Sequence, residues 1–202
     1  IWDTALGERG QEDFSQPFNL INAAYSGDGL QLITATPEHN AIVWRRDPPI
    51  VPAFSLDHQA PIGLVVYGPG NNRIVTATTA GTVHLWNATS GDSISGLTTA
   101  DMRTTKVIFR PDGGQLATLT TDRTIHIWNA ADGHQLQQFG PLPGPVTAFA
   151  FHPTDSLLFT ASLANTEPVI SLVQAWGIQP GKTVGNPLRV KGIIRSMTMH
   201  PD

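Results

Sequence analysis

The chain has 202 residues, a formal net charge of −4, 19 Gly, 16 Pro and no Cys. Glycine and proline make up about 17% of it, against a usual level of about 12%, so many turns and short elements are expected rather than a helical bundle. The lack of cysteine excludes disulfide scaffolds, thiolate metal sites and thiol nucleophiles, and the acidic balance argues against a general nucleic-acid binder.

The tryptophans mark an internal repeat. Four of the five are 42 residues apart and the fifth follows after 48: Trp2, Trp44, Trp86, Trp128 and Trp176. A second series keeps the same intervals: Tyr25, Tyr67, Phe109, Phe151 and Met199. A period of this length is typical of supersecondary units that bury a shared core by stacking.

In chain order, the repeat predicts four complete units with a partial unit at each end. Residues 1–16 hold the end of one strand, which carries Trp2, and a following strand. The complete units span about 17–56, 57–97, 98–139 and 140–190. Residues 191–202 hold one more first strand, expected at 193–200. We therefore interpret 1–202 as a single segment of a longer repeat array.

The unit at 98–139 indicates how each one is built. Alternating, β-branched segments predict strands at 105–110, 115–120 and 124–129, with a fourth at about 134–139. The turn residues Pro111-Asp112-Gly113 follow the first strand, and Asp132-Gly133 precede the last. Each complete unit is thus expected to be a four-stranded antiparallel sheet.

The unit at 140–190 departs from the repeat in two places. Six extra residues around 164–168 lie between its second and third strands, and they predict either a longer hairpin or a contact loop on a rigid scaffold. Basic residues also gather near its end, where they form either a solvated face or a docking patch for an acidic partner: Lys182, Arg189, Lys191 and Arg195.

These units resemble the WD-repeat family of β-propellers. The motifs that carry the resemblance are Ile1-Trp2-Asp3, Leu85-Trp86-Asn87, Ile127-Trp128-Asn129, Phe109-Arg110-Pro111-Asp112-Gly113 and Asp57-His58. The resemblance implies an all-β fold, with four complete four-stranded antiparallel blades, partial blades at both ends and an incomplete ring. Residues 181–188 look like those of bacterial WD-repeat proteins.

The resemblance also implies a hydrogen-bond network of His, Ser or Thr, Asp and Trp in each blade. No blade here has all four. The second complete blade has His58 and Thr76 or Thr78, but Ala80 stands in the acid position, whereas the third has Asp122 and lacks the His. Apolar packing between blades is therefore expected to carry more of the stability.

In this family, the loops after the second and fourth strands of each blade share one face, where partners bind. We call the residues expected there the candidate docking face: Glu38, His39, Asp57, His58, Asp101, Arg103, Asp122, Arg123 and Glu167. The implied function is a non-catalytic protein–protein interaction scaffold that displays these loops to a partner protein or an attached domain.

The residues favour no catalytic, metal or cofactor site. His84 and His126 recur in register before a tryptophan among apolar neighbours, which indicates packing rather than ligation. The segment Ser26-Gly27-Asp28-Gly29 is a turn rather than a nucleophile elbow, and Gly68-Pro69-Gly70 lacks the lysine and helix of a phosphate loop. We expect no enzyme activity, cofactor, nucleic-acid partner, small-molecule substrate or membrane span.

The alternative hypothesis is part of a secreted or periplasmic enzymatic propeller with a site in its central channel. Such a site needs polar or metal-binding residues at the channel-side ends of the first strands, and the expected first strands of the four complete units contain no carboxylate or histidine. We accordingly expect a cytoplasmic scaffold, with the periplasm or the extracellular space as the alternative location.

Overall fold

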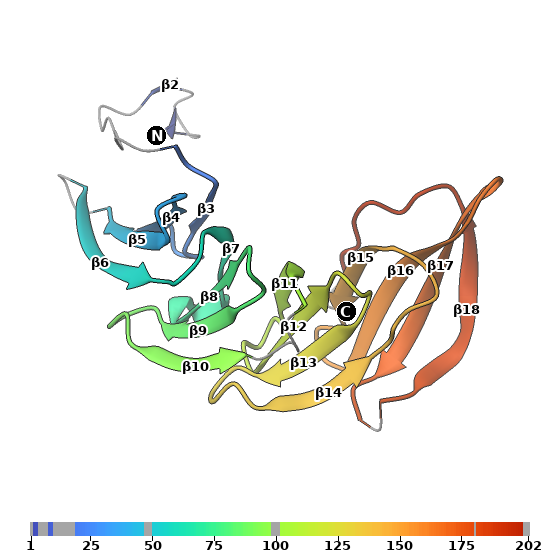
Figure 1. Cartoon of the computed structure of the whole chain (residues 1–202). Helices are drawn as coiled ribbons and strands as arrows, with labels where there is room; N and C mark the ends of the chain where they lie inside the picture. Colours follow the sequence, from blue (N-terminus) through green and yellow to red (C-terminus); the bar gives the residue numbers. More distant parts are fainter. Residues whose placement is uncertain are drawn as a thin grey trace.

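The computed structural model describes residues 2–3, 8–9, 19–46, 50–97, 102–179 and 181–199. Their strands form four four-stranded antiparallel sheets and one two-stranded sheet (Figure 1). No helix among the described residues has the length and hydropathy needed to cross a membrane.

The four-stranded sheets follow one another along the chain, and in each the strands pair in chain order. The first sheet contains β3 (Asn22–Tyr25), β4 (Gln31–Ala35), β5 (Asn40–Arg45) and β6 (Val51–Asp57). The second contains β7 (Ile62–Tyr67), β8 (Arg73–Thr78), β9 (Val83–Asn87) and β10 (Ser93–Leu97), with the short 3-10 turn η1 (Pro69–Asn71) between β7 and β8. The third contains β11 (Thr104–Phe109), β12 (Gln115–Thr120), β13 (Ile125–Asn129) and β14 (Gln135–Phe139). The fourth contains β15 (Val146–Phe151), β16 (Leu157–Thr166), β17 (Val169–Gly177) and β18 (Thr183–Lys191), while β1 (Trp2–Asp3) pairs with β2 (Glu8–Arg9).

The all-β expectation is confirmed, and so is the order of strands within the third unit. β12 begins and ends as predicted, β11 is shifted by one residue at both ends, and β13 and β14 each begin one residue later than predicted. The turns supply the reason, because Gly113 and Gly133 have φ of 75° and 77°, a conformation that glycine adopts without steric cost.

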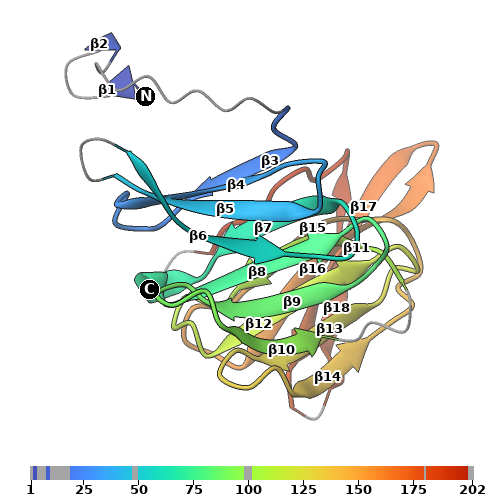
Figure 2. The same ribbon diagram turned by 60° about the vertical axis from the view of Figure 1, so that its left-hand side comes forward.

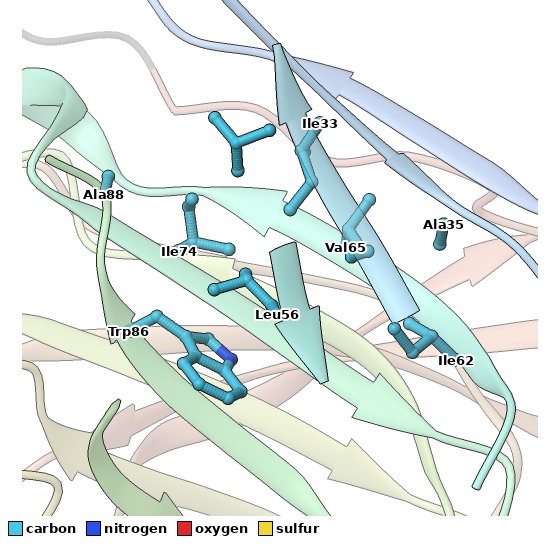
Figure 3. Packing of buried hydrophobic residues seen from close by; sticks show 10 residues of the cluster. Ile33, Ala35, Leu56, Ile62, Val65, Ile74, Trp86 and Ala88 are labelled. Carbon is cyan, nitrogen blue, oxygen red and sulfur yellow. The ribbon is translucent and has the colours of Figure 1, made fainter. Parts of the chain in front are cut away.

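The hydrophobic core lies between neighbouring sheets rather than within one of them (Figure 2). Between the first and second sheets, Ile33, Val43 and Leu56 pack with Ile62 and Ile74, all fully buried (Figure 3). Separate clusters join the second sheet to the third and the third to the fourth. Each inner sheet therefore uses both of its faces, as the repeat predicts.

The four sheets succeed one another around an arc, and the ring is not closed (Figure 1). This arrangement agrees with the expected incomplete ring of four complete units. The interpretation of 1–202 as one propeller segment stays a prediction.

The expected strand at 193–200 is wrong for its described part, because residues 193–199 belong to no strand. A strand needs a partner for its backbone groups, and this sequence holds no second strand for that unit. The chain after β18 is instead held by Ser171, whose hydroxyl donates to the carbonyl oxygen of Gly192 (2.6 Å) and accepts from the amide of Ile194 (3.3 Å).

The six extra residues of the fourth unit form a longer hairpin. β16 and β17 have 10 and 9 residues, against 6 and 5 for β12 and β13, and their register continues to the pair Thr166–Val169. The insertion thus lengthens two strands that remain paired, and of the two readings the longer hairpin describes its structure.

Candidate functional site

At one end of the sheets, backbone hydrogen bonds join the turn after a second strand to the loop that follows the fourth strand of the same sheet. The amide of His58 donates to the carbonyl oxygen of His39 (2.8 Å), and the amide of Leu142 donates to that of Arg123 (3.0 Å). The two pairs are 84 residues, or two repeats, apart. The same backbone hydrogen bond therefore anchors equivalent loops of the candidate docking face in two repeats.

The accepting residue of each pair has a left-handed backbone. φ is 69° at His39 and 70° at Arg123, while the same repeat position in the second sheet is Gly81, with φ of 100°. Left-handed φ is uncommon for residues other than glycine, so these turns have a defined shape and are not loosely connected segments. Their side chains start from fixed backbone positions.

The described members of the candidate docking face are exposed, with one exception. The exposed residues are Glu38, His39, Asp57, Arg103, Asp122, Arg123 and Glu167. His58 is half-buried, and Asp101 lies outside the described residues. Exposed side chains of both charge signs thus lie on loops that are anchored by backbone bonds, and their contact with a partner stays a prediction.

His58 belongs to the internal network that the family resemblance implies. Its Nδ1 donates to the carbonyl oxygen of Leu56 (2.9 Å), and its Nε2 lies 2.7 Å from Oγ1 of Thr76, which also accepts from Trp86 Nε1 (2.8 Å). Of the two threonines proposed for this role, the structure selects Thr76. Burial lowers the pKa of His58 and that of His84, whose ring centroid lies 5.3 Å away.

The tryptophan–threonine bond recurs in every four-stranded sheet. The Nε1–Oγ1 distances are 2.8–3.0 Å for the pairs Trp44–Thr34, Trp86–Thr76, Trp128–Thr118 and Trp176–Thr160. The side chain of Trp2 lies outside the described part. Because an unpaired indole N–H is costly to bury, this bond accounts for the threonine that accompanies each tryptophan in the repeat.

Asp122 has a structural role in its turn. Its carboxylate accepts hydrogen bonds from the hydroxyl of Thr120 (2.6 Å) and from the amide and hydroxyl of Thr124 (3.1 and 3.0 Å). The hydroxyl of Thr120 is the largest cause that lowers the pKa of Asp122. This carboxylate is therefore already engaged within the protein, whereas that of Glu38, on the equivalent turn of the first sheet, accepts no hydrogen bond from the other described residues.

Among the described residues, the other candidate features form no cluster of metal-binding side chains. Over the described residues, no group of three or more His, Asp or Glu side chains is placed to hold a metal ion. The basic residues near the end of the fourth unit are all exposed: Lys182, Arg189, Lys191 and Arg195. They lie on or beside the outer strand β18, so both interpretations of this cluster remain.

Sequence reasoning missed a groove between the first and second sheets. It has a volume of about 310 Å³ and lies at the opposite end of the strands from the candidate docking face, lined by Asp28, Leu30, Gln31, Arg45, Arg46, Asn71 and Thr89. The repeat gave little signal for it, because the position of Gln31 holds Arg73 in the second unit but Gln115 in the third. The groove depends on contacts across two units, which a pattern within one unit does not reveal.

Comparison with known proteins gives one family and one architecture. The family model described as "WD domain, G-beta repeat" matches residues 94–129 and 133–166. No curated protein sequence matches the chain. Among solved structures, the chain is similar to "Structure of U3-55K", with a TM-score of 0.66 and 14% sequence identity over 85% of this chain. The match spans 52% of that structure's chain, so this chain covers about half its length.

Proposed function

Because the chain belongs to the WD40 repeat family, we propose that it is a non-catalytic scaffold for protein–protein interaction. It acts by rigid display: the stacked blades hold the candidate docking face in a fixed arrangement, and a partner protein or an attached domain docks across it. A rigid surface loses little conformational entropy on binding, so even a polar, charged face can contribute affinity.

The observation that carries this proposal is a backbone hydrogen bond that recurs at two equivalent places on the candidate docking face. His39 and Arg123 each accept an amide hydrogen bond from the loop that follows the fourth strand of their own sheet, and both residues are exposed with φ near 70°. The backbone contact that ties the outgoing loop to the end of each sheet therefore also fixes an exposed charged or titratable side chain. Exposed residues on scaffold-anchored loops are the usual carriers of binding specificity.

The test is a photo-crosslinking experiment on the intact protein. A photoreactive amino acid in place of Glu38 is expected to capture a discrete partner, and the combined charge reversals Arg103→Glu and Arg123→Glu are expected to abolish that capture. The matched control is Lys182→Glu, an exposed reversal on the fourth blade outside this face. Capture that survives the face reversals, or that is lost equally with the control, would contradict this choice of face.

A further inference from the structure

The groove between the first two blades lies at a seam that, among the described residues, lacks the arginine contact found at the other two seams. Between the second and third blades, Nε of Arg73 donates to the carbonyl oxygen of Ala130 (3.0 Å). Between the third and fourth blades, Nη2 of Arg110 donates to the carbonyl oxygen of Thr154 (3.2 Å). In both places an arginine of the earlier blade crosses to a turn of the later one.

The corresponding positions of the first blade hold shorter side chains. Gln31 stands in the place of Arg73, and Ser26 stands in the place of Arg110. Gln31 Oε1 accepts a long hydrogen bond from the hydroxyl of Tyr67 (3.4 Å), and Ser26 donates to Asp28 within its own turn. Among the described residues no arginine crosses this seam, which is where the groove of about 310 Å³ lies.

The groove is rich in hydrogen-bond donors that lack a partner within the protein. Arg45 and Arg46 both line it and are exposed, and within the described ranges neither guanidinium forms an ion pair or a side-chain hydrogen bond. Asn71 Oδ1 accepts the amide of Gly27, and the Asn71 side chain also interacts with the Asp28 carboxylate, whose pKa it helps to lower. Two adjacent unpaired guanidinium groups favour a ligand that carries carboxylates.

Acceptor and apolar groups lie on the same groove. Asp28 Oδ1 accepts from the hydroxyl of Ser26 (2.6 Å) and from the amide of Leu30 (3.0 Å), which leaves Oδ2 as an acceptor. The hydroxyl of Ser26 is the largest cause that lowers the pKa of Asp28, so this carboxylate is ionised near neutral pH. The side chain of Leu30 is 61% exposed and offers an apolar contact.

We propose that this groove binds an acidic peptide segment, with a ligand carboxylate paired to Arg45 and Arg46 and an apolar ligand side chain against Leu30. The Asp28 carboxylate offers an acceptor for the amide groups of a peptide backbone. A phosphate dianion fits less well, because Asp28 places a negative charge on the same groove and a phosphate offers no N–H. The volume is near the lower limit of about 300 Å³ for ligand pockets, so the contact involves a few ligand residues.

This site is distinct from the candidate docking face, and it stands whether or not that face binds a partner. The probe is the fluorescein-labelled pentapeptide GELEG, titrated against the protein by fluorescence polarisation at low ionic strength, with GQLQG as the neutral control peptide. We expect saturable binding of GELEG and at least tenfold weaker binding of GQLQG. The double variant Arg45→Gln and Arg46→Gln is expected to weaken GELEG binding at least tenfold, with unchanged thermal unfolding.

The matched control removes the same charge elsewhere, by Lys182→Gln and Arg189→Gln, and is expected to change the affinity less than twofold. A second variant, Gln31→Arg, introduces the arginine that the second blade has at this position (Arg73) and is expected to weaken binding by occupying the groove, although it adds a positive charge. Tighter binding of GELEG to the Gln31→Arg variant would show that net charge causes the interaction, and would overturn the proposal that the groove is the binding site. The proposal would also be overturned if GELEG showed no saturable binding. The same holds if the Lys182 and Arg189 control lost as much affinity for GELEG as the Arg45 and Arg46 variant.

Discussion

The Nε2 atom of His58 lies 2.7 Å from Oγ1 of Thr76, and this contact determines which ring nitrogen carries the proton. The carbonyl oxygen of Leu56 can only accept, so Nδ1 holds the hydrogen (2.9 Å). Since the oxygen of Thr76 accepts from Trp86 Nε1, its own hydroxyl hydrogen points to His58. The chain of bonds from Trp86 to Leu56 is complete only when His58 is neutral.

Acid is therefore expected to destabilise the protein through His58. Burial is the first cause that lowers its pKa, and the charge of His84 lowers it further. A folded-state pKa below the ordinary value of about 6.5 gives stability that is full above that value and lost as the pH falls through the folded-state pKa. We expect the free energy of unfolding in urea to be lower at pH 5.5 than at pH 7.5.

The variant His58→Leu is expected to show a smaller loss between these two pH values. Leucine is a suitable replacement because Leu142 occupies the equivalent position of the fourth blade, where it is buried. Some pH dependence should remain, since burial also lowers the pKa of His84 and His126. An identical pH dependence in the variant and the parent protein would show that His58 does not titrate in this range.

The tryptophan–threonine bond is expected to contribute measurably in each blade. Thr118→Val keeps the side-chain shape and leaves the Nε1 group of Trp128 (3% exposed) without its acceptor. We expect a loss of about 1–3 kcal/mol in the free energy of unfolding, measured in urea. The control Thr183→Val changes an exposed threonine of β18 and should stay within about 0.5 kcal/mol. Equal losses of stability in Thr118→Val and Thr183→Val would show that the hydrogen bond between Trp128 and Thr118 is not the cause.

Two glycines with the same backbone separate conformational strain from packing. Gly29 and Gly133 have φ of 70° and 77°, so alanine is strained at both, by about 1–2 kcal/mol. An added Cβ meets nothing within 4 Å at Gly29, but lies 2.5 Å from Cβ of Ser95 at Gly133. Gly133→Ala is therefore expected to lower the melting temperature clearly more than Gly29→Ala, and similar losses would contradict the close contact between β10 and the turn at 133.

The acidic position in the turn after the second strand of a blade can be tested by removing the carboxylate of the third blade and by adding one to the second blade. Asp122→Ala removes the acceptor of Thr120 and Thr124 and is expected to cost about 1 kcal/mol, at the low end for a charged acceptor because solvent screens the exposed carboxylate. The reciprocal change is Ala80→Asp, where the hydroxyls of Thr78 and Thr82 now bond each other (2.6 Å). We expect Ala80→Asp to raise the midpoint of urea unfolding, and a lowered midpoint would contradict the equivalence of the two turns.

Much of the fold follows from patterns within one repeat. The 42-residue interval locates the sheets, and β12 is predicted to the residue because an alternating segment lies between two strong turn signals. The strand expected at 193–200 failed because strand formation depends on a partner and not only on the residues of the strand itself.

The candidate sites were less accessible to sequence reasoning. The sequence left Thr76 and Thr78 as equal partners for His58, and only the side-chain geometry separates them: Thr76 bonds both His58 and Trp86, while Thr78 bonds Thr82 in the turn. The groove at Arg45 and Arg46 also could not be predicted, because it depends on which side chains cross from one sheet to the next.

The division of contacts within this fold limits how such a chain can change after duplication. Each tryptophan–threonine bond lies within one sheet, whereas each apolar cluster takes residues from two sheets. A copied repeat therefore brings its own polar bonds, but it remains stable only beside neighbours whose side chains fit both of its faces. Sequence drift is consequently freer in the polar positions of a single unit, while the apolar positions of adjacent units must change together.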